Sequence, residues 1–239
     1  MIYSPGDRQA IPGWINVYKA GKTKFALGDN LNIFDTTYVD NVVHAHLLAA
    51  EKLEQKVHLS VFDHRRKPVQ ATLPRRKLPT SADAPLSGGE SLSQEQREKL
   101  DPPLPAVRNR FDQWFDADNV ADDSGMISVA GQAYYVSNGE PINFWAWGRT
   151  IWYEYAGYDK SMTLLPASVG FAFVQLMGLI SSITGRANSM PADKVKYSVA
   201  KRYYNIEKAR ALLGYEPIVG LDEGLKKAVA VRILHRAAL

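Results

Sequence analysis

The feature that most constrains this chain is an uncharged, apolar stretch from residue 161 to residue 185. Its core, residues 164–183, would extend about 30 Å as a helix, which is long enough to cross the hydrocarbon layer of a bilayer. A helix packed in a protein core usually keeps a polar stripe, whereas this segment reads as apolar on all faces. The stretch therefore predicts a membrane-associated helix, and the alternative is a buried core helix.

The residues within and around the stretch indicate how such a helix would meet a membrane. Pro166, Gly170, Gln175 and Gly178 argue against a simple spanning helix. Lys160 precedes the stretch, and basic residues follow it: Arg186, Lys194, Lys196, Lys201 and Arg202. The segments on both sides are predicted to belong to one globular domain, which a single crossing would divide. We therefore expect a helix that lies in the plane of the membrane or re-enters it.

The composition excludes several classes of site. The 239 residues suffice for one large domain or two small ones. The net charge of +4 is too weak to indicate a nucleic-acid partner, and the absence of cysteine excludes disulfides, thiolate nucleophiles and cysteine-bound zinc. His44 and His46 are two residues apart, so they diverge on a helix and cannot share one metal ion. No metal site is predicted.

Strand and helix signals alternate along the chain, which indicates an α/β fold. The strand signals are residues 1–3, 33–39 and 132–136, and the helix signals are residues 11–20, 41–54, 142–156, 206–213 and 221–234. Asp40 is the expected N-cap of the helix 41–54. The buried face of that helix is predicted to consist of Val43, Leu47 and Ala50, which recur at i, i+4 and i+7.

Between residues 56 and 123 the composition changes. This part holds seven of the thirteen prolines, the run Ser87-Gly88-Gly89 and a charge-rich run at 94–99. Such a segment cannot bury enough apolar surface to offset the entropy lost on ordering, so we predict a disordered insertion. We interpret its two basic clusters, residues 65–67 and 75–77, as solvated loop residues rather than as a nuclear localisation signal.

The predicted division of the chain is 1–55 as part of an α/β core, 56–128 as the insertion, 129–160 as a strand and a helix, 161–185 as the apolar helix and 186–239 as a C-terminal subdomain.

Three blocks of sequence carry a resemblance to a known family. Residues 3–9 read Tyr-Ser-Pro-Gly-Asp-Arg-Gln, residues 34–42 read Phe-Asp-Thr-Thr-Tyr-Val-Asp-Asn-Val, and residues 203–217 read Tyr-Tyr-Asn-Ile-Glu-Lys-Ala-Arg-Ala-Leu-Leu-Gly-Tyr-Glu-Pro. They resemble the C-terminal part of the extended short-chain dehydrogenases, most closely the 3β-hydroxysteroid dehydrogenase and sterol-4α-carboxylate 3-dehydrogenase (decarboxylating) family. The resemblance implies the C-terminal portion of a doubly wound, Rossmann-type α/β fold with a helical substrate subdomain. A truncated gene model, a fragment and a degenerate paralogue would share this pattern.

The resemblance also implies a cofactor side and a substrate side. In the family, the Pro-Gly-Asp turn follows the strand whose end approaches the nicotinamide, which implies that Tyr3 and Pro5 lie on the cofactor side. Gln9, Phe34 and Tyr38 are implied on the substrate side, since flat apolar walls suit a fused-ring sterol. For Phe34 and Tyr38 the alternative is a place in the core.

Hydride transfer in this class needs a glycine-rich strand-to-helix turn for the cofactor pyrophosphate and a tyrosine activated by a nearby lysine. The glycine motif is absent from the sequence. Tyr197 and Lys201 form a Tyr-x-x-x-Lys pattern, which we interpret as a chance match because it directly precedes the block 203–217, far downstream of the family's catalytic pair. No catalytic residue is therefore assigned. We expect the chain alone to be inactive and not to bind NAD or NADP tightly.

At the level of the family, the resemblance implies an NAD(P)-dependent dehydrogenase that takes hydride from a sterol 3β-hydroxyl in sterol biosynthesis. The alternatives are a non-catalytic, membrane-associated sterol-binding remnant and a relative of the nucleotide-sugar epimerases. The implied partners are a sterol or steroid and membrane lipid, with no nucleic acid, and a homo-oligomer is left open. The basic flanks of the apolar stretch predict the cytosolic face of the endoplasmic reticulum or of the lipid-droplet membrane.

Overall fold

Helices and strands alternate in the computed structural model, which describes residues 1–28, 30, 32–62, 121–158, 160, 162–185, 192–200 and 202–237. The strands are β1 (Ile2–Tyr3), β2 (Phe25–Leu27), β3 (Ile33–Phe34), β4 (Thr37–Tyr38), β5 (Lys56–His58), β6 (Met126–Ser128), β7 (Ile142–Asn143) and β8 (Thr163–Leu165). The helices are α1 (Ala10–Lys19), α2 (Val39–Glu51), α6 (Phe144–Ala156), α7 (Ala167–Thr184), α8 (Ala192–Val199), α9 (Glu207–Leu213), α10 (Leu221–Ala237) and the short 3-10 helix η1 (Leu59–Phe62). The α/β class predicted from the sequence is confirmed.

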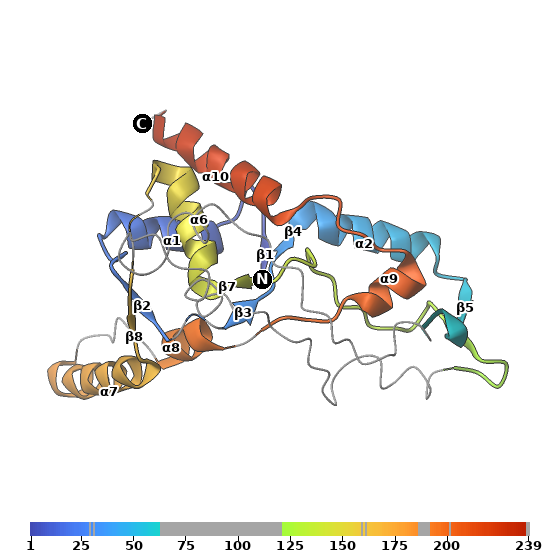
Figure 1. Ribbon diagram of the computed structural model, residues 1–239, viewed down its shortest axis with the longest axis horizontal. Helices are drawn as coiled ribbons and strands as arrows, with labels where there is room; N and C mark the ends of the chain where they lie inside the picture. Colours follow the sequence, from blue (N-terminus) through green and yellow to red (C-terminus); the bar gives the residue numbers. More distant parts are fainter. Residues whose placement is uncertain are drawn as a thin grey trace, which may run out of the picture.

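The described strands pair two by two. β1 with β4 and β2 with β8 are parallel, whereas β3 with β7 and β5 with β6 are antiparallel. Three of these pairs join the first 60 residues to residues beyond 120. The later half of the chain therefore packs back onto the earlier half (Figure 1).

Helix α6 is the centre of the main core, where α1 and α10 pack against it (Figure 1). Trp147, Ile151 and Trp152 of this helix are fully buried. Its start is fixed by Asn30, which has a positive φ of 54° and accepts a hydrogen bond at Oδ1 from the Trp145 N–H (3.1 Å). The side-chain oxygen satisfies one of the N–H groups that every helix leaves unpaired at its first turn.

Helix α2 is rotated relative to the prediction. It begins at Val39, so Asp40 lies in its first turn and is not the N-cap. Val43 and Leu47, the predicted buried face, are 52% and 65% exposed. Asn41 is buried instead, and its amide bonds the backbone at residues 218–219. These contacts across the fold set the rotation of the helix, and the local apolar pattern does not reveal them.

Both flanks of the predicted insertion are ordered. Residues 56–58 and 126–128, which we expected within it, pair as β5 and β6. The Asp122 carboxylate accepts hydrogen bonds from the Met126 N–H (2.9 Å) and the Lys56 ammonium (2.9 Å), which closes this hairpin-like unit. Residues 63–120 lie outside the described residues. The predicted strand 132–136 is irregular backbone.

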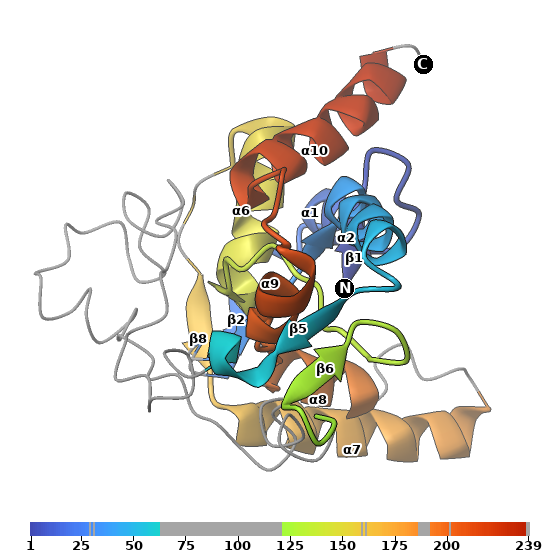
Figure 2. The ribbon, with the colours of Figure 1, turned by 90° about the vertical axis from the view of Figure 1, so that its right-hand side faces the viewer.

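Helix α7 runs along one edge of the molecule, at the opposite end from α10 (Figures 1 and 2). It is the one helix in the described part that is long and apolar enough to cross a membrane, and only 11% of it is buried, so it is not a core helix. From the sequence we expected this segment to be apolar on all faces, and that expectation is wrong. Ser168, Gln175 and Ser182 are spaced by seven residues and lie in line along the helix, and Ser181 and Thr184 are further polar residues near its end.

Candidate site at the carboxyl end of a parallel strand pair

The parallel strands β1 and β4 bring two predicted site residues together. Their register pairs Tyr3 with Tyr38, so both tyrosines stand at the carboxyl ends of the strands. In open α/β sheets, ligands bind just outside the carboxyl ends of parallel strands. The loop Ser4–Gln9, which leaves β1 at this end, is therefore the candidate site, with the two tyrosines beneath it.

The loop is a turn that starts helix α1. The Asp7 N–H donates to the Ser4 carbonyl (3.1 Å), which closes the predicted turn. The Asp7 carboxylate then accepts hydrogen bonds from the N–H groups of Gln9 (2.9 Å), Ala10 (3.3 Å) and Ile11 (2.7 Å). A carboxylate at this position satisfies the free N–H groups and complements the helix dipole. Asp7 is thus the capping residue of α1.

Pro5 and Gln9, the predicted site residues of this loop, differ in exposure. Pro5 is half-buried, whereas Gln9 is exposed and its side chain is open to a ligand. The far side of the loop is held by Arg232 of α10, which donates to the Asp7 carbonyl. The loop therefore presents the exposed polar side chains of Arg8 and Gln9 outward, on a backbone that is held by the hydrogen bonds of Asp7 and Arg232.

Tyr3 is a buried anchor rather than an acid or base. Its hydroxyl donates to the Leu221 carbonyl (3.3 Å) and accepts a hydrogen bond from the Asn138 amide (3.4 Å). Burial raises the pKa of Tyr3, and burial also raises that of Tyr38. A tyrosine that exchanges protons with a substrate at neutral pH needs a lowered pKa. Neither tyrosine is suited to that role.

Phe34 and Tyr38 lie in the same buried cluster as Tyr3. The Tyr3 ring meets that of Tyr38 edge-on at 5.5 Å, and the Phe34 ring meets that of Trp147 at 5.9 Å. Both residues are 3% exposed, which is the core position that the sequence left as the alternative. A role of either ring at a sterol stays a prediction.

Tyr197 packs against this aromatic cluster from helix α8. Its ring lies 5.8 Å from that of Phe144, and the Arg202 guanidinium lies over the Tyr197 ring, 4.2 Å from its centre. Helix α8 ends at Val199, and Lys201 lies outside the described residues. The helical i, i+4 arrangement that would bring Tyr197 and Lys201 together is therefore not provided by α8.

A polar hub beneath the site escaped the sequence analysis. Asn138 accepts hydrogen bonds at Oδ1 from the Tyr38 N–H and the Asn41 amide, both at 2.8 Å. Its own amide donates to Tyr3. One side chain thereby ties the turn at residue 138 to β1, β4 and α2. The partners lie about a hundred residues apart, and Asn138 stands in the turn-forming run Ser137-Asn138-Gly139, so no local pattern pointed to this role.

Asp35 is a second buried polar group that was not predicted. It accepts a hydrogen bond from the Tyr204 N–H (3.0 Å), and burial raises its pKa to about 6. It links the strand region 33–38 to the segment before α9. Asp35 follows the apolar Phe34 in a segment that was predicted as a strand, but its partner could not be inferred from the sequence.

The described residues do not fit the pyrophosphate of a dinucleotide at the two strand-to-helix connections of the β1–β4 pair. Such a site needs free N–H groups at a helix start. At β1–α1 the Asp7 carboxylate occupies them, and at β4–α2 Asp40 places a negative charge in the first turn.

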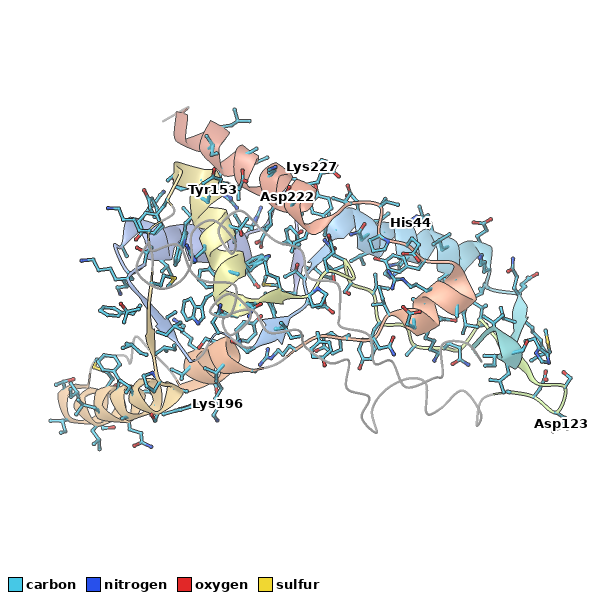
Figure 3. All side chains as sticks on the ribbon, viewed as in Figure 1. His44, Asp123, Tyr153, Lys196, Asp222 and Lys227 are labelled. Atoms are coloured by element: carbon cyan, nitrogen blue, oxygen red, sulfur yellow. The ribbon has the colours of Figure 1, made fainter. Side chains whose placement is uncertain are left out.

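Within the described ranges no cluster of three histidine or acidic side chains could hold a metal. His44, on α2, has its ring 6.2 Å from that of Tyr215 (Figure 3).

Comparisons with known proteins agree with the sequence blocks. The family profile described as the 3-beta hydroxysteroid dehydrogenase/isomerase family matches residues 1–66. The chain is 31% identical to a sterol-4-alpha-carboxylate 3-dehydrogenase, decarboxylating, of Saccharomyces cerevisiae, over 96% of this chain and 46% of that protein. Its counterpart from Schizosaccharomyces pombe is 28% identical over 96% of this chain and 47% of the relative.

Among solved structures, a UDP-glucose 4-epimerase from Thermotoga maritima with UDP-glucose is similar at a TM-score of 0.43 and 17% identity. The similarity covers the whole of this chain and 44% of that one. The chain spans a little under half the length of the two curated relatives above. The resemblance predicted from the sequence is confirmed: over nearly its whole length the chain is similar to sterol-4-alpha-carboxylate 3-dehydrogenases, and its first 66 residues match the 3-beta hydroxysteroid dehydrogenase/isomerase family.

Proposed function

We propose that this chain supplies the substrate side of a sterol dehydrogenase, which takes hydride from a sterol 3β-hydroxyl to NAD or NADP in sterol biosynthesis. The observation that carries the proposal is the similarity to sterol-4-alpha-carboxylate 3-dehydrogenases over 96% of the chain. The Ser4–Gln9 loop at the carboxyl end of a parallel strand pair supports it, since a ligand of an α/β fold binds at such an end.

In this function, the residues of the chain position the substrate and do not take part in the chemical step. Asp7 and Arg232 hold the loop, Tyr3 and Tyr38 pack edge-on in the core at the ends of the two strands, and Gln9 presents an amide that can bond a polar group of the sterol. The capped start of α1 leaves no cradle for a pyrophosphate. We therefore expect the chain alone neither to bind NAD or NADP tightly nor to turn over a sterol.

A sterol-binding test addresses this proposal directly. Energy transfer from tryptophan to a fluorescent 3β-hydroxysterol should show saturable binding to the purified full chain. Gln9→Ala should weaken that binding about three- to tenfold through the loss of one hydrogen bond, whereas the neighbouring Arg8→Ala serves as the matched control. Absence of sterol binding, or tight and saturable binding of NAD or NADP, would contradict the proposal.

A non-catalytic sterol-binding protein is the second candidate. It is favoured by the raised pKa of Tyr3 and by the occupied N–H groups of α1, which together leave the described site without a proton donor or a cofactor cradle. Sustained formation of NADH by the purified chain with a 3β-hydroxysterol would exclude this candidate.

We also propose that the protein resides at the cytosolic face of the endoplasmic reticulum or of lipid droplets. The long exposed apolar helix α7 supports a membrane location. Fractionation of cells that express the chain tests it: the protein should stay with carbonate-washed membranes or with floating droplets. Recovery of the protein in the soluble fraction would contradict this location.

A further inference from the structure

The turn at residues 137–141 contains the dipeptide Asn138-Gly139, and no other asparagine of the sequence is followed by glycine. The backbone nitrogen of the next residue can attack the side-chain amide of an asparagine, because the two groups are neighbours along the chain. A side chain on that next residue hinders the approach, whereas glycine has no Cβ. Asn138 is therefore the asparagine of this chain that is best placed for spontaneous deamidation.

The reaction needs only the chain and water. The Gly139 nitrogen bonds to the side-chain carbonyl carbon of Asn138, its proton leaves with the departing amide nitrogen as ammonia, and a cyclic imide results. Water then adds to one of the two imide carbonyls and breaks the bond of that carbonyl to the Gly139 nitrogen. Opening on the side-chain branch gives aspartate, and opening on the main-chain branch gives isoaspartate, in which the main chain runs through the former side chain.

The fold engages both reacting groups. The Gly139 N–H donates to Ser137 Oγ (3.1 Å). The Asn138 amide, which is 3% exposed, accepts two hydrogen bonds at Oδ1 and donates one to the Tyr3 hydroxyl (3.4 Å). Rotation of this amide toward the Gly139 nitrogen would leave its buried partners without hydrogen bonds, which is costly. The imide can therefore form only when the turn opens.

The structure requires both members of the reactive pair. Asn138 must accept and donate hydrogen bonds at the same time, which a carboxylate cannot do. Gly139 has a positive φ of 65°, in the left-handed region, and a Cβ there would lie 3.2 Å from Ile206 and 3.4 Å from Arg210. The chemical sensitivity of this turn is thus a consequence of its structure.

An aspartate at position 138 would disturb the hydrogen bonds beneath the candidate site. The Tyr3 hydroxyl has a single proton, which it donates to the Leu221 carbonyl (3.3 Å), and it now accepts from the Asn138 amide. With a carboxylate in place of that amide, two acceptors would face the one proton. The new charge would also be buried close to the Glu140 carboxylate, which accepts from the Leu221 N–H (2.6 Å). A buried charge without a cationic partner destabilises the folded state.

Isoaspartate would disturb the main chain as well. It adds one carbon to the main chain between residues 138 and 139. The Asn138 N–H donates to the Thr36 carbonyl (3.1 Å), while Gly139 lies against Ile206, so the added carbon displaces one of these contacts. Strand β4, to which the Asn138 side chain is bonded, contacts β1, α2 and α10 (Figure 1). Both products therefore weaken the link that joins these elements.

We propose that Asn138-Gly139 is a deamidation site that the fold itself controls. The closed turn suppresses the reaction, whereas the open turn undergoes it and then cannot rebuild the Asn138 hub. Time that the chain spends unfolded is thereby converted into a permanent loss of the native fold. This inference is independent of the proposed dehydrogenase function, because the reaction needs neither sterol nor cofactor.

Peptide mass spectrometry of the purified full chain tests the control by the fold. In urea at mildly alkaline pH, the peptide that contains residue 138 should gain the mass difference between an amide and an acid, and an isoaspartate-specific methyltransferase should label it. In the same buffer without urea the conversion should be at least about a hundredfold slower, because only the open turn reacts. Equal rates in the two conditions, or no conversion in urea, would overturn the proposal.

Two controls show that the dipeptide is responsible. Asn143 is also buried but is followed by Phe144, so it should stay unchanged with and without urea. Gly139→Ala should slow the conversion of residue 138 severalfold in urea, where the strain that this substitution causes in the fold has no influence. Conversion of Asn143 at the same rate as Asn138 would contradict the assignment of the site.

Refolding tests the consequence of the modification. After increasing times in urea, the fraction of chains that regain native tryptophan fluorescence on dilution should fall in step with the fraction deamidated at residue 138. Asn138→Asp, which makes one product directly, should raise the equilibrium constant of unfolding at least about tenfold.

Asn205→Asp is the matched control for the change of charge. It lies at the start of α9, where Asn205 Oδ1 accepts from the Glu207 N–H (2.8 Å) and a carboxylate serves equally well, so the equilibrium constant should change by less than about threefold. Deamidated chains that refold as fully as unmodified ones, or equal stability of Asn138→Asp and Asn205→Asp, would overturn the proposal.

Discussion

Helices α6 and α7 are both rich in apolar residues, yet they lie in different surroundings. Nine residues of α6 are buried, among them Trp147, Ile151 and Trp152, whereas α7 buries only two. Helix α6 is met on two sides, by α1 and α10, and α7 is met on one side near its start. Apolar composition therefore shows that a helix needs a partner. Only the tertiary arrangement shows whether the protein itself provides it.

The glycines of the two helices show the same difference. A Cβ at Gly148 of α6 would overlap the Trp14 ring, so this glycine lets the Trp14 side chain of α1 pack directly on α6. A Cβ at Gly178 of α7 would meet no atom within 4 Å. The first glycine is required by packing, and the second is not.

The largest expected effect comes from shortening one isoleucine in each helix. Ile151→Ala in α6 should lower the free energy of unfolding by about 2–5 kcal/mol, because it leaves a cavity in a fully buried site. Ile183→Ala in α7 should change it by less than about 0.5 kcal/mol, because that side chain is 84% exposed. Urea unfolding followed by tryptophan fluorescence, without lipid, measures both. Equal losses would remove the distinction between the two helices.

The glycine pair gives the next largest effect. Gly148→Ala should destabilise the protein by about 1–3 kcal/mol, since the added methyl group displaces Trp14. Gly178→Ala should leave stability unchanged or raise it by up to about 1 kcal/mol, because alanine favours the helix more than glycine. The same urea experiment applies, and a destabilising Gly178→Ala would show that α7 is packed more tightly than its exposure indicates.

A smaller effect is expected from pH. The pKa of Asp35 is raised to about 6, so the folded state holds this proton more tightly than the unfolded state does. Stability from this group is therefore present at low pH and is lost as pH rises from about 4 to about 6. Over this pH range, the free energy of unfolding of the Asp35→Asn variant should therefore fall by about 1–2 kcal/mol less than that of the unmodified chain.

Helix α7 provides the control for this pH effect, because it has no titratable side chain. The stability difference between Ile183→Ala and the unmodified chain should be the same at pH 4.5 and pH 7, within about 0.3 kcal/mol. Unfolding curves of Asp35→Asn and the unmodified chain with identical pH dependence would show that Asp35 is not the group responsible.

Local patterns in the sequence predicted the elements that local chemistry determines. The turn at Ser4–Asp7, the helix after it and the last helix all lie close to their predicted positions. The apolar helix was predicted at 161–185 and observed at Ala167–Thr184. Each of these depends on neighbours within a few residues, so the pattern alone was sufficient.

Contacts across the fold account for what could not be predicted. The rotation of α2 is set by Asn41, whose partners are near residues 138 and 218. In the candidate site the sequence located the loop and its two tyrosines, but not the Asn138 hub beneath them. The role of Asp7 as the cap of α1 also became clear only from its three backbone hydrogen bonds.

Amide hydrogen exchange of the full chain, with and without anionic vesicles, tests the central distinction most directly. The amides of α6 should exchange slowly and at the same rate in both conditions, because the protein interior already protects them. The amides of α7 from Leu176 onward should exchange faster than those of α6 in buffer and slow by at least about tenfold when vesicles are present. If α7 is as protected as α6 in buffer, or if vesicles leave its exchange unchanged, the lipid-facing role of α7 is contradicted.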